Sequence, residues 1–353
     1  MAIEITGVGS YIPKVIMKNE DFLDHKFYTP DGQGFDDHPE TIIKKFENIT
    51  GIRERRYVSE DLNVSDIATI AAERALENAG IDPETLDYII VAHNFGDVKH
   101  GSTQTDILPS IAARVKSKLR IKSPRAVAYD VIFGCPGWLE GSIQAMAYIR
   151  AGLAKRCLII GAETLSRVVD PHDRDSMIYS DGAGATILEE VPGDDHGILS
   201  HGSASFTEDE SHLIFFGETN KQDLYENTGY IKMYGRKIYN FALTNVPLAM
   251  KTCFDKSGKD ISELKKIFIH QANEKMDEAI VERFYKLYGK PMPENVMPMI
   301  IDKLGNSSVA TIPTLYDLFL KGHFENQSLE KGDVIMFASV GAGMNINAMT
   351  YQV

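Results

Sequence analysis

Cys135 has the most suggestive chemical surroundings of any residue in this sequence. It lies within residues 130–138, where an apolar run leads into Gly-Cys-Pro-Gly and a helix rich in small residues is expected over 139–150. A thiol beside a helix N-terminus meets free N–H groups and the positive end of the helix dipole, which favour the nucleophilic thiolate. The alternative is a small buried hydrophobe, which we prefer for Cys157 and Cys253 because they lie in apolar patterns. For Cys135, covalent catalysis and a structural role stand as equal alternatives at this point.

Two further polar residues lie where catalytic groups are often found. His270 ends the apolar run 266–270, at the carboxyl edge of an expected buried strand, where open α/β sheets bind ligands. A lone histidine at such a place is more often a structural group. Asn306 precedes an expected helix over 312–320, where its amide is either a donor to a developing oxyanion or a helix N-cap.

Buried strands that alternate with helices must position these residues. The segment 64–80 has apolar residues at helical spacing and ends in a glycine. Continuous apolar runs, typical of strands covered on both faces, occupy residues 88–92, 126–131, 157–161, 266–270 and 334–338. This alternation predicts an α/β architecture.

The chain also contains an internal repeat. Residues 80–91 align without a gap on residues 258–269, and both segments predict a helix stop, a turn and a buried strand. In this alignment Ala92 corresponds to His270, so the fold does not require a histidine at that position. This difference indicates that His270 has a polar role in the second half. Gly-Ala-Gly occurs at 182–184 and at 341–343, which predicts that each half ends in a turn and an outgoing strand. We expect an N-terminal half over 1–192 and a C-terminal half over 193–353.

Composition limits the classes of function. The chain has 353 residues, 43% of them hydrophobic, and no apolar run approaches the roughly 20 residues that a membrane span needs. A net charge of −13 disfavours nucleic-acid binding. Three distant cysteines disfavour a disulfide framework and a zinc site, and the first residues do not resemble a signal peptide. We therefore expect a cytoplasmic protein without a bound metal.

The ordered motifs resemble those of the thiolase-superfamily ketosynthases, specifically the ketoacyl-(acyl carrier protein) synthase III type. They are Gly-Val-Gly-Ser-Tyr-Ile-Pro at 7–13, Thr-Gly-Ile-Arg-Glu-Arg-Arg at 50–56, Asp-Pro-His-Asp-Arg at 170–174, Ser-Asp-Gly-Ala-Gly-Ala at 180–185, Met-Tyr-Gly-Arg-Lys-Ile-Tyr at 233–239, His-Gln-Ala-Asn at 270–273, Gly-Asn-Ser-Ser at 305–308 and Gly-Ala-Gly at 341–343. The resemblance covers nearly the whole chain. It implies a thiolase fold, which is a duplicated five-layer αβαβα arrangement, and an obligate homodimer.

The resemblance also implies a catalytic triad of Cys135, His270 and Asn306. Cys135 would take an acyl group from a thioester of coenzyme A or of acyl carrier protein phosphopantetheine, with no other cofactor. Backbone N–H groups of Cys135 and Ala342 would form the first oxyanion hole. His270 and Asn306 would stabilise the enolate left when malonyl-acyl carrier protein loses CO2, and that enolate would attack the acyl-Cys135.

The sequence departs from the family pattern at the positions that contact the nucleotide. Substrate or carrier contacts are implied at Arg174, Asn273, Lys275 and Arg53. The usual adenine-stacking aromatic residue aligns near Lys45, a usual Arg is Ile49, and an acidic stretch over 28–40 looks like an insertion. We therefore expect a specialised paralogue that takes its acyl group from a carrier protein or joins two acyl chains, as in dialkylresorcinol or long-chain ketone pathways.

Other functions remain as alternatives. The acyl-cysteine could be captured by an oxygen or nitrogen nucleophile, which would make the protein an acyltransferase of secondary metabolism. A hydroxymethylglutaryl-CoA synthase needs a glutamate acid/base that we do not place in this sequence. A non-catalytic partner subunit generally lacks the nucleophile. The basic stretch over 114–125 is either a docking site for an acidic partner or a solvated helix end.

Overall fold

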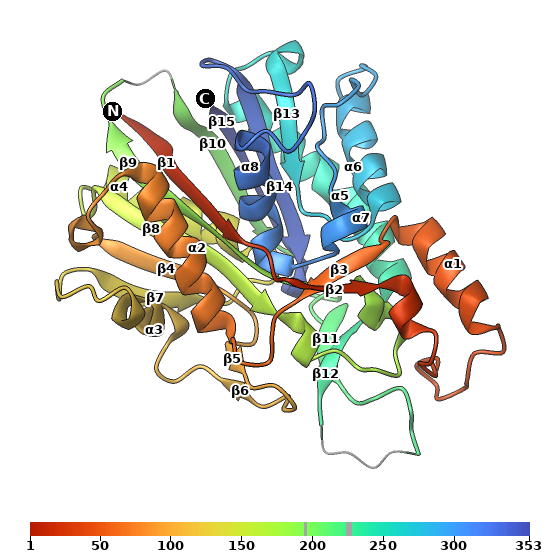
Figure 1. Ribbon diagram of the computed structural model, residues 1–353. Coiled ribbons are helices and arrows are strands. Elements are labelled where there is room, and N and C mark those ends of the chain that lie inside the picture. Colours follow the sequence, from red (N-terminus) through yellow and green to blue (C-terminus); the bar gives the residue numbers. More distant parts are fainter. Residues whose placement is uncertain (194–195, 224–227) are drawn as a thin grey trace.

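Two β-sheets form the core of the computed structural model, which describes residues 1–193, 196–223 and 228–353 (Figure 1). The first sheet has the strand order β1 (Ala2–Tyr11), β9 (Asp181–Val191), β8 (Arg156–Thr164), β4 (Tyr88–Ala92), β7 (Val127–Val131). The second sheet has the order β10 (Gly197–Ser205), β15 (Asn345–Gln352), β14 (Val334–Gly341), β13 (Leu264–Ile269). The apolar runs found in the sequence therefore form strands of these two sheets.

The two sheets repeat one another in order and direction. β1–β9 and β9–β8 pair antiparallel and β8–β4 pair parallel. β10–β15 and β15–β14 pair antiparallel and β14–β13 pair parallel in the same way. β7 is an additional strand, which pairs parallel with β4 and forms an edge. The duplication expected from the sequence is thus confirmed at the level of whole sheets, while the division at residue 192 stays a prediction.

Helices form three layers around the sheets. α2 (Val64–Ala79) and α3 (Ile111–Lys118) share an apolar core with the outer face of the first sheet. α4 (Gly137–Arg150) and α8 (Thr311–Leu320) share a core with both sheets and therefore lie between them. α5 (Gly235–Lys256) and α6 (Glu274–Lys286) cover the outer face of the second sheet. The expected five-layer αβαβα arrangement is confirmed.

Alternation along the central strands explains why they are apolar throughout. In β4, Ile89 packs toward the α2 layer and Ile90 toward the α4 layer. In β8, Ile160 and Ile159 divide between the same two layers. Because helices cover both faces of the sheet, residues that point to one face are as buried as those that point to the other.

The expectation for Gly-Ala-Gly was right in one half and wrong in the other. Residues 341–343 make a turn between β14 and β15. Residues 182–184, by contrast, lie within β9, which is hydrogen-bonded to β1 on one side and to β8 on the other. Pairing on both sides keeps this tripeptide extended, and residues 165–180 make the connection that corresponds to the turn.

Shorter elements lie at the end of the sheets where the central parallel strands finish (Figure 1). They are β2 (Val15–Lys18) paired with β3 (Glu54–Tyr57), β5 (Asp97–Val98) with β6 (Thr105–Asp106), β11 (Ile214–Gly217) with β12 (Tyr230–Met233), and the helices α1 (Pro39–Thr50) and α7 (Ile301–Leu304). Among the described helices, none combines the length and apolar character that crossing a bilayer requires.

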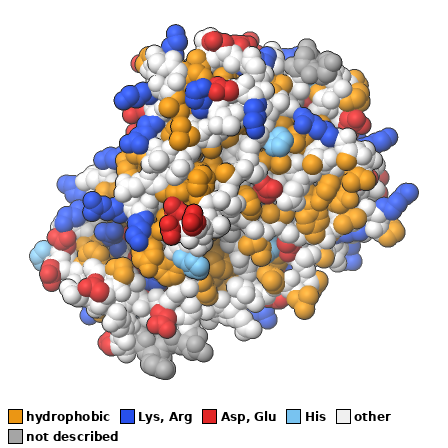
Figure 2. Space-filling view, turned by 180° about the vertical axis from the view of Figure 1, so that it is seen from behind, with side chains coloured by type: hydrophobic (Ala, Val, Ile, Leu, Met, Phe, Trp, Pro, Cys, Tyr) orange, Lys and Arg blue, Asp and Glu red, His pale blue; other side chains and the backbone are white. Residues whose placement is uncertain are grey.

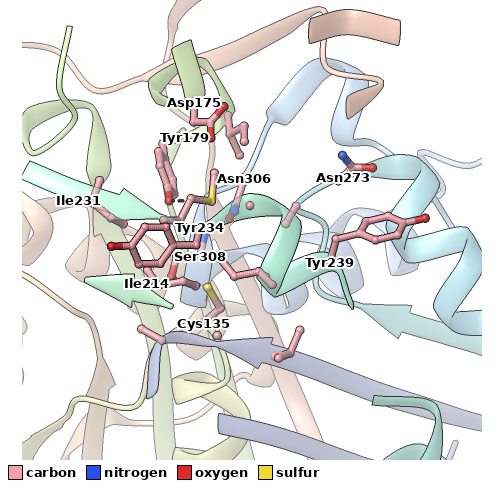
Figure 3. Close-up of a pocket in the computed structure, with 18 of the residues that line it drawn as sticks. Cys135, Asp175, Tyr179, Ile214, Ile231, Tyr234, Tyr239, Asn273, Asn306 and Ser308 are labelled. Atoms are coloured by element: carbon pink, nitrogen blue, oxygen red, sulfur yellow. Dashed lines mark hydrogen bonds between the residues drawn. The ribbon is translucent and has the colours of Figure 1, made fainter. Parts of the chain in front are cut away.

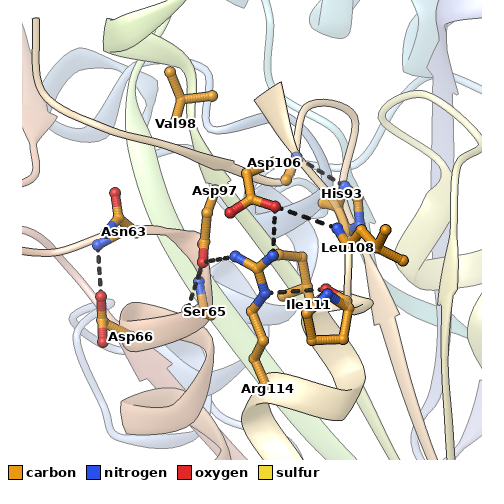
Figure 4. A network of polar contacts seen from close by, with 12 residues as sticks. Asn63, Ser65, Asp66, His93, Asp97, Val98, Asp106, Leu108, Ile111 and Arg114 are labelled. Atoms are coloured by element: carbon orange, nitrogen blue, oxygen red, sulfur yellow. Dashed lines mark hydrogen bonds and ion pairs between the residues drawn. The ribbon is translucent and has the colours of Figure 1, made fainter. Parts of the chain in front are cut away.

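The start of the basic stretch 114–125 is engaged within the chain. Arg114 on α3 donates to Asp97 at 2.7 Å and to Asp106 at 2.6 Å (Figure 4). Lys116 donates to two backbone carbonyls. The contacts of Arg114 fix the loop that precedes α3, and those of Lys116 fix the segment that follows it, so the first basic residues of this stretch stabilise the fold.

Candidate active site

A cavity of about 1000 Å³ opens where strands of both sheets end. Its lining includes Cys135 between β7 and α4, His270 directly after β13, and Asn306 ahead of α8. Figure 3 shows Cys135, Asn306 and Ser308 close together within the cavity. The structure therefore brings together Cys135 from the first half and His270 and Asn306 from the second, which are far apart in the sequence.

The backbone at Cys135 lies tightly against the turn 341–343. A Cβ atom on Gly341 would lie 2.4 Å from the backbone nitrogen of Cys135. A Cβ on Gly134, whose φ is +65°, would lie 2.6 Å from the backbone nitrogen of Ala342. Glycine at both positions lets the two nitrogens share one narrow region of the cavity. Neighbouring N–H groups of this kind are suited to bind an oxyanion.

Opposing influences act on the thiol of Cys135. Burial, and to a smaller extent the charge of Glu163, raise its pKa to about 11, while a hydrogen bond from Ser308 Oγ, 3.3 Å from Sγ, and a backbone hydrogen bond act to lower it. α4 begins at Gly137, so the cysteine does stand beside a helix N-terminus. The net direction of the pKa shift is nevertheless opposite to the thiolate that we expected, because desolvation outweighs the favourable contacts. The resting group at neutral pH is a thiol that must lose its proton as it reacts.

His270 and Asn306 supply neutral polar groups to the cavity. Burial lowers the pKa of His270 to about 4, so its imidazole is uncharged near neutral pH. Its Nδ1 has no hydrogen-bond partner among the described residues. The Oδ1 of Asn306 accepts from the backbone nitrogen of Ser308 at 2.8 Å, which fixes the amide and leaves its NH2 group as the donor. A neutral imidazole and an amide can stabilise a negative oxygen without readily protonating a carbanion.

Sequence reasoning missed two groups behind the cysteine. Glu163, near the end of β8, is fully buried, and its Oε1 accepts from the backbone and the side-chain nitrogen of Asn94 at 2.8 and 2.5 Å. Burial raises the pKa of Glu163 to about 8. The two missed residues are Glu163, near the carboxyl end of β8, and Asn94, just after the carboxyl end of β4. Other residues of the site lie at the same edge of the sheet, and this position was the signal that the sequence offered.

Two of the four candidate substrate contacts line the cavity. Arg174 and Asn273 do so, and the Asn273 side chain also caps the first turn of α6. Arg53 is outside the lining, with its side chain 72% exposed and paired with Glu47 at 3.4 Å. Lys275 is exposed on α6, also outside the lining. Within the described parts of the chain, no group of three His, Cys, Asp or Glu side chains is arranged to hold a metal ion.

The acidic stretch 28–40 folds against the cavity entrance. Pro30 is part of the lining, and the guanidinium carbon of Arg174 lies 5.5 Å from the centre of the Phe35 ring. Asp175 accepts from the same guanidinium at 3.0 Å. Lys45, at the position expected to carry the aromatic residue, pairs with Asp37 at 2.7 Å instead. The aromatic partner of Arg174 thus comes from the acidic stretch 28–40, which sequence reasoning did not foresee.

One side of the cavity is strongly apolar. Figure 3 shows Ile214, Ile231 and Tyr179 on one side of the site and Asn273 and Tyr239 on the other. We call this side the apolar arm, and its lining consists of Phe95, Leu165, Tyr179, Ile214, Phe216, Ile231 and Met233. The reactive groups therefore have an apolar surface beside them.

Comparisons with known proteins agree with this geometry. A family model for 3-oxoacyl-[acyl-carrier-protein (ACP)] synthase III matches residues 129–205, and the model for its C-terminal part matches residues 254–353. The curated β-ketoacyl-[acyl-carrier-protein] synthase III of Erythrobacter litoralis is 30% identical over 347 residues, which cover 98% of this chain and 97% of that protein. The chain belongs to the β-ketoacyl-[acyl-carrier-protein] synthase III family.

Solved structures of synthase III proteins share the whole fold. The enzyme from Aquifex aeolicus VF5 superposes with a TM-score of 0.82 at 29% identity and full coverage of both chains. The enzyme from Thermus thermophilus gives a TM-score of 0.81 at 28% identity, with 99% of each chain covered. The thiolase fold implied by the motifs is therefore confirmed for this member of the synthase III family.

Proposed function

We propose that this chain catalyses the decarboxylating Claisen condensation of an acyl thioester with malonyl-acyl carrier protein. The products are a β-ketoacyl thioester, CO2 and the free donor thiol. The observation that carries the proposal is the meeting of Cys135, His270 and Asn306 in one cavity, beside the backbone nitrogens of Cys135 and Ala342. The reaction uses no cofactor besides its thioester substrates.

In the first step, the sulfur of Cys135 attacks the donor carbonyl carbon. The thiol loses its proton to solvent as the sulfur attacks, and the departing donor thiolate takes a proton from solvent, so the neutral imidazole of His270 keeps its N–H for the second step. The N–H groups of Cys135 and Ala342 hold the oxyanion, and the product is acyl-Cys135. A nucleophilic thiol must stay reduced, which supports a cytoplasmic location.

In the second step, malonyl-acyl carrier protein enters and loses CO2. The electron pair of the broken carbon–carbon bond forms an enolate, whose oxygen accepts hydrogen bonds from His270 and the Asn306 amide. The enolate carbon attacks the acyl carbon, and the Cys135 thiolate leaves and takes a proton from solvent. Each bond broken is thereby balanced by one formed.

We further propose that the enzyme is a specialised paralogue whose acyl donor is longer than acetyl and arrives on a carrier protein. The apolar arm supports a longer aliphatic chain, because apolar surface that is covered by a ligand is stabilised by about 25 cal/mol per Å². Phe35 and Asp175 already engage Arg174, the position that resembles the family's adenine contact. This arrangement leaves less of the guanidinium for a nucleotide and favours a carrier-bound donor.

The exposed edge strand supports a homodimer. β7 has one unpaired edge, and Ile132, which follows it, is 63% exposed. Leu108, in the loop fixed by Arg114, is 87% exposed. Figure 2 shows hydrophobic side chains gathered on the side of the molecule where β7 lies. An unpaired edge flanked by apolar side chains is suited to pairing with the same edge of a second copy.

Intact-protein mass spectrometry tests the chemistry directly. Wild type and Cys135→Ala are incubated with a panel of acyl-CoA and acyl-carrier thioesters. We expect an adduct of one acyl group on wild type, absent from the variant, and larger with carrier-bound donors of more than two carbons. Addition of malonyl-acyl carrier protein should then release CO2 and give a β-ketoacyl product.

Three results would overturn parts of this proposal. An adduct that persists in Cys135→Ala excludes the nucleophile. An acyl group that moves to an oxygen or nitrogen acceptor without CO2 release indicates an acyltransferase. A strong preference for acetyl-CoA excludes the specialised donor.

A further inference from the structure

A hydrogen-bond chain of three side chains ends on the sulfur of Cys135. Glu163 Oε1 accepts from Asn94, the Nδ2 of Asn94 donates to Ser308 Oγ at 3.2 Å, and Ser308 Oγ donates to Cys135 Sγ at 3.3 Å. The mechanism above does not use these three residues. They come from β8, from the segment after β4 and from the segment before α8, so only the folded chain brings them together.

The chain has a defined direction at Ser308. A hydroxyl group has one proton to donate and accepts through its lone pairs. Because the Nδ2 of Asn94 donates to Ser308 Oγ, the hydroxyl proton is left for the sulfur. The backbone nitrogen of Ser308 donates to Asn306 at 2.8 Å, which fixes this residue from the other side.

Asn94 is oriented by Glu163. Its backbone nitrogen and its Nδ2 both donate to the same carboxyl oxygen, at 2.8 and 2.5 Å. The reversed amide would place its oxygen against that oxygen and leave Ser308 without this donor. Glu163 is fully buried, and burial raises its pKa to about 8, so near neutral pH it is mostly a neutral acid that accepts through Oε1.

We propose that Ser308 is a further catalytic residue, whose hydroxyl donates to the sulfur of Cys135 whenever that sulfur carries negative charge. Asn94 and Glu163 are positioning residues that hold the hydroxyl in this orientation. The inference rests on the proposed function, because charge then develops on the sulfur twice, during attack on the donor and during release from acyl-Cys135. No proton is transferred from Ser308. Hydrogen bonds to charged groups are about twice as strong as neutral ones.

Other ionisable groups also face the sulfur, so the test must separate their effects. The titratable and charged groups that line the same cavity are Arg174, Asp175, Tyr179, Tyr234, Arg236, Lys237, Tyr239 and His270, and Glu163 stands behind Asn94. None of them is changed in Ser308→Ala. A shift in the titration of the thiol in that variant therefore reports the hydroxyl.

The experiment measures the rate of Cys135 alkylation by iodoacetamide against pH, without substrate. Ser308→Ala should raise the apparent pKa of the thiol by about one unit, which slows alkylation about tenfold at each pH below it. Asn94→Ala should raise it by about half a unit, because the hydroxyl is then free to rotate. Glu163→Gln keeps an oxygen acceptor but removes the negative charge that Glu163 carries above about pH 8, so it should lower the apparent pKa of the thiol. Ser307→Ala is the matched control, since Ser307 contacts Thr311 and not the sulfur.

Each outcome decides the proposal. An unchanged thiol pKa in Ser308→Ala overturns it, and so does an equal shift in Ser307→Ala. A shift in Ser308→Ala without any in Asn94→Ala overturns the positioning role. Thermal melts of all variants check that they fold. If Asn94→Ala does not fold, Ser308→Ala, the smallest change, still tests the role of the hydroxyl. Alkylation needs no condensation, so a failure of the proposed function would appear in the product assay and not in this titration.

Discussion

In the proposed mechanism, Asn306 and Cys135 serve different steps, although both line one cavity. There the amide of Asn306 takes no part in the attack on the donor thioester, and its NH2 group meets negative charge only after decarboxylation. Asn306→Ala should therefore lower condensation roughly 10²- to 10³-fold and leave acylation of Cys135 close to wild type. Single-turnover acylation and CO2 release, measured on the same preparation, check this. An equal loss of both steps would show that Asn306 supports the structure of the site as a whole.

Glu163 makes stability depend on pH. Its pKa is about 8 in the folded chain and near 4.5 when exposed, so the folded state holds the proton more tightly. This stability is fully present below pH 4.5 and is lost as the pH rises to 8. Between pH 5 and 8, wild type should lose about 3 kcal/mol of unfolding free energy more than Glu163→Gln does. Urea unfolding at both pH values measures the difference, and parallel pH profiles would contradict it.

At the scale of elements, the contact between the turn 341–343 and the segment before α4 shapes the oxyanion hole that we propose. Gly341 has an extended backbone, so alanine there is opposed by contacts and not by backbone strain: its Cβ would lie 2.4 Å from the backbone nitrogen of Cys135 and 2.8 Å from Cδ of Pro136. Gly341→Ala should lower acylation at least about tenfold and cost about 1–3 kcal/mol of stability. Gly202→Ala on β10 is the control, because a Cβ there meets no atom within 4 Å. Acylation rates and urea unfolding test both variants, and unchanged acylation in Gly341→Ala would contradict the prediction.

The β12 strand is anchored by a buried ion pair. Lys232 donates to Asp170 at 2.5 Å and to Asp173 at 3.0 Å, and Asp170 is only 1% exposed. Lys232→Met leaves a buried carboxylate uncompensated and should cost about 3–5 kcal/mol. Adding Asp170→Asn should recover part of the loss. Urea unfolding of the single and double variants measures both effects, and a stable single variant would show that solvent reaches the pair.

Local pattern was enough to predict some elements but not the contacts between them. The helix over 64–80, the strand at 88–92 and the strand–turn–helix around Cys135 depend on neighbouring residues, and the structure has all three. The path from Glu163 to Ser308 depends on three segments meeting in space, which no spacing encodes. The same holds for Phe35, which reaches Arg174 from the acidic stretch 28–40, a segment without a recognisable pattern.

At the scale of the whole molecule, the exposed edge of β7 predicts a dimer. Ile132→Glu places a charge beside this edge and should weaken self-association at least about tenfold. Leu248→Glu is the control, because Leu248 is 51% exposed on α5 in the other half. Light scattering after size exclusion, over a range of micromolar concentrations, measures the change. Equal behaviour of the two variants would place the interface elsewhere.

The two sheets are copies in strand order and direction, yet their chemical contributions differ. In the proposed mechanism, the first copy supplies the nucleophile, and the second supplies the imidazole, the amide and one backbone donor. His270 has only Ala92 as its counterpart. An ancestral pair of identical halves would have offered two equivalent sites across the same seam. The proposed mechanism instead divides the groups of one site between the two copies, so that neither half alone would carry out the reaction.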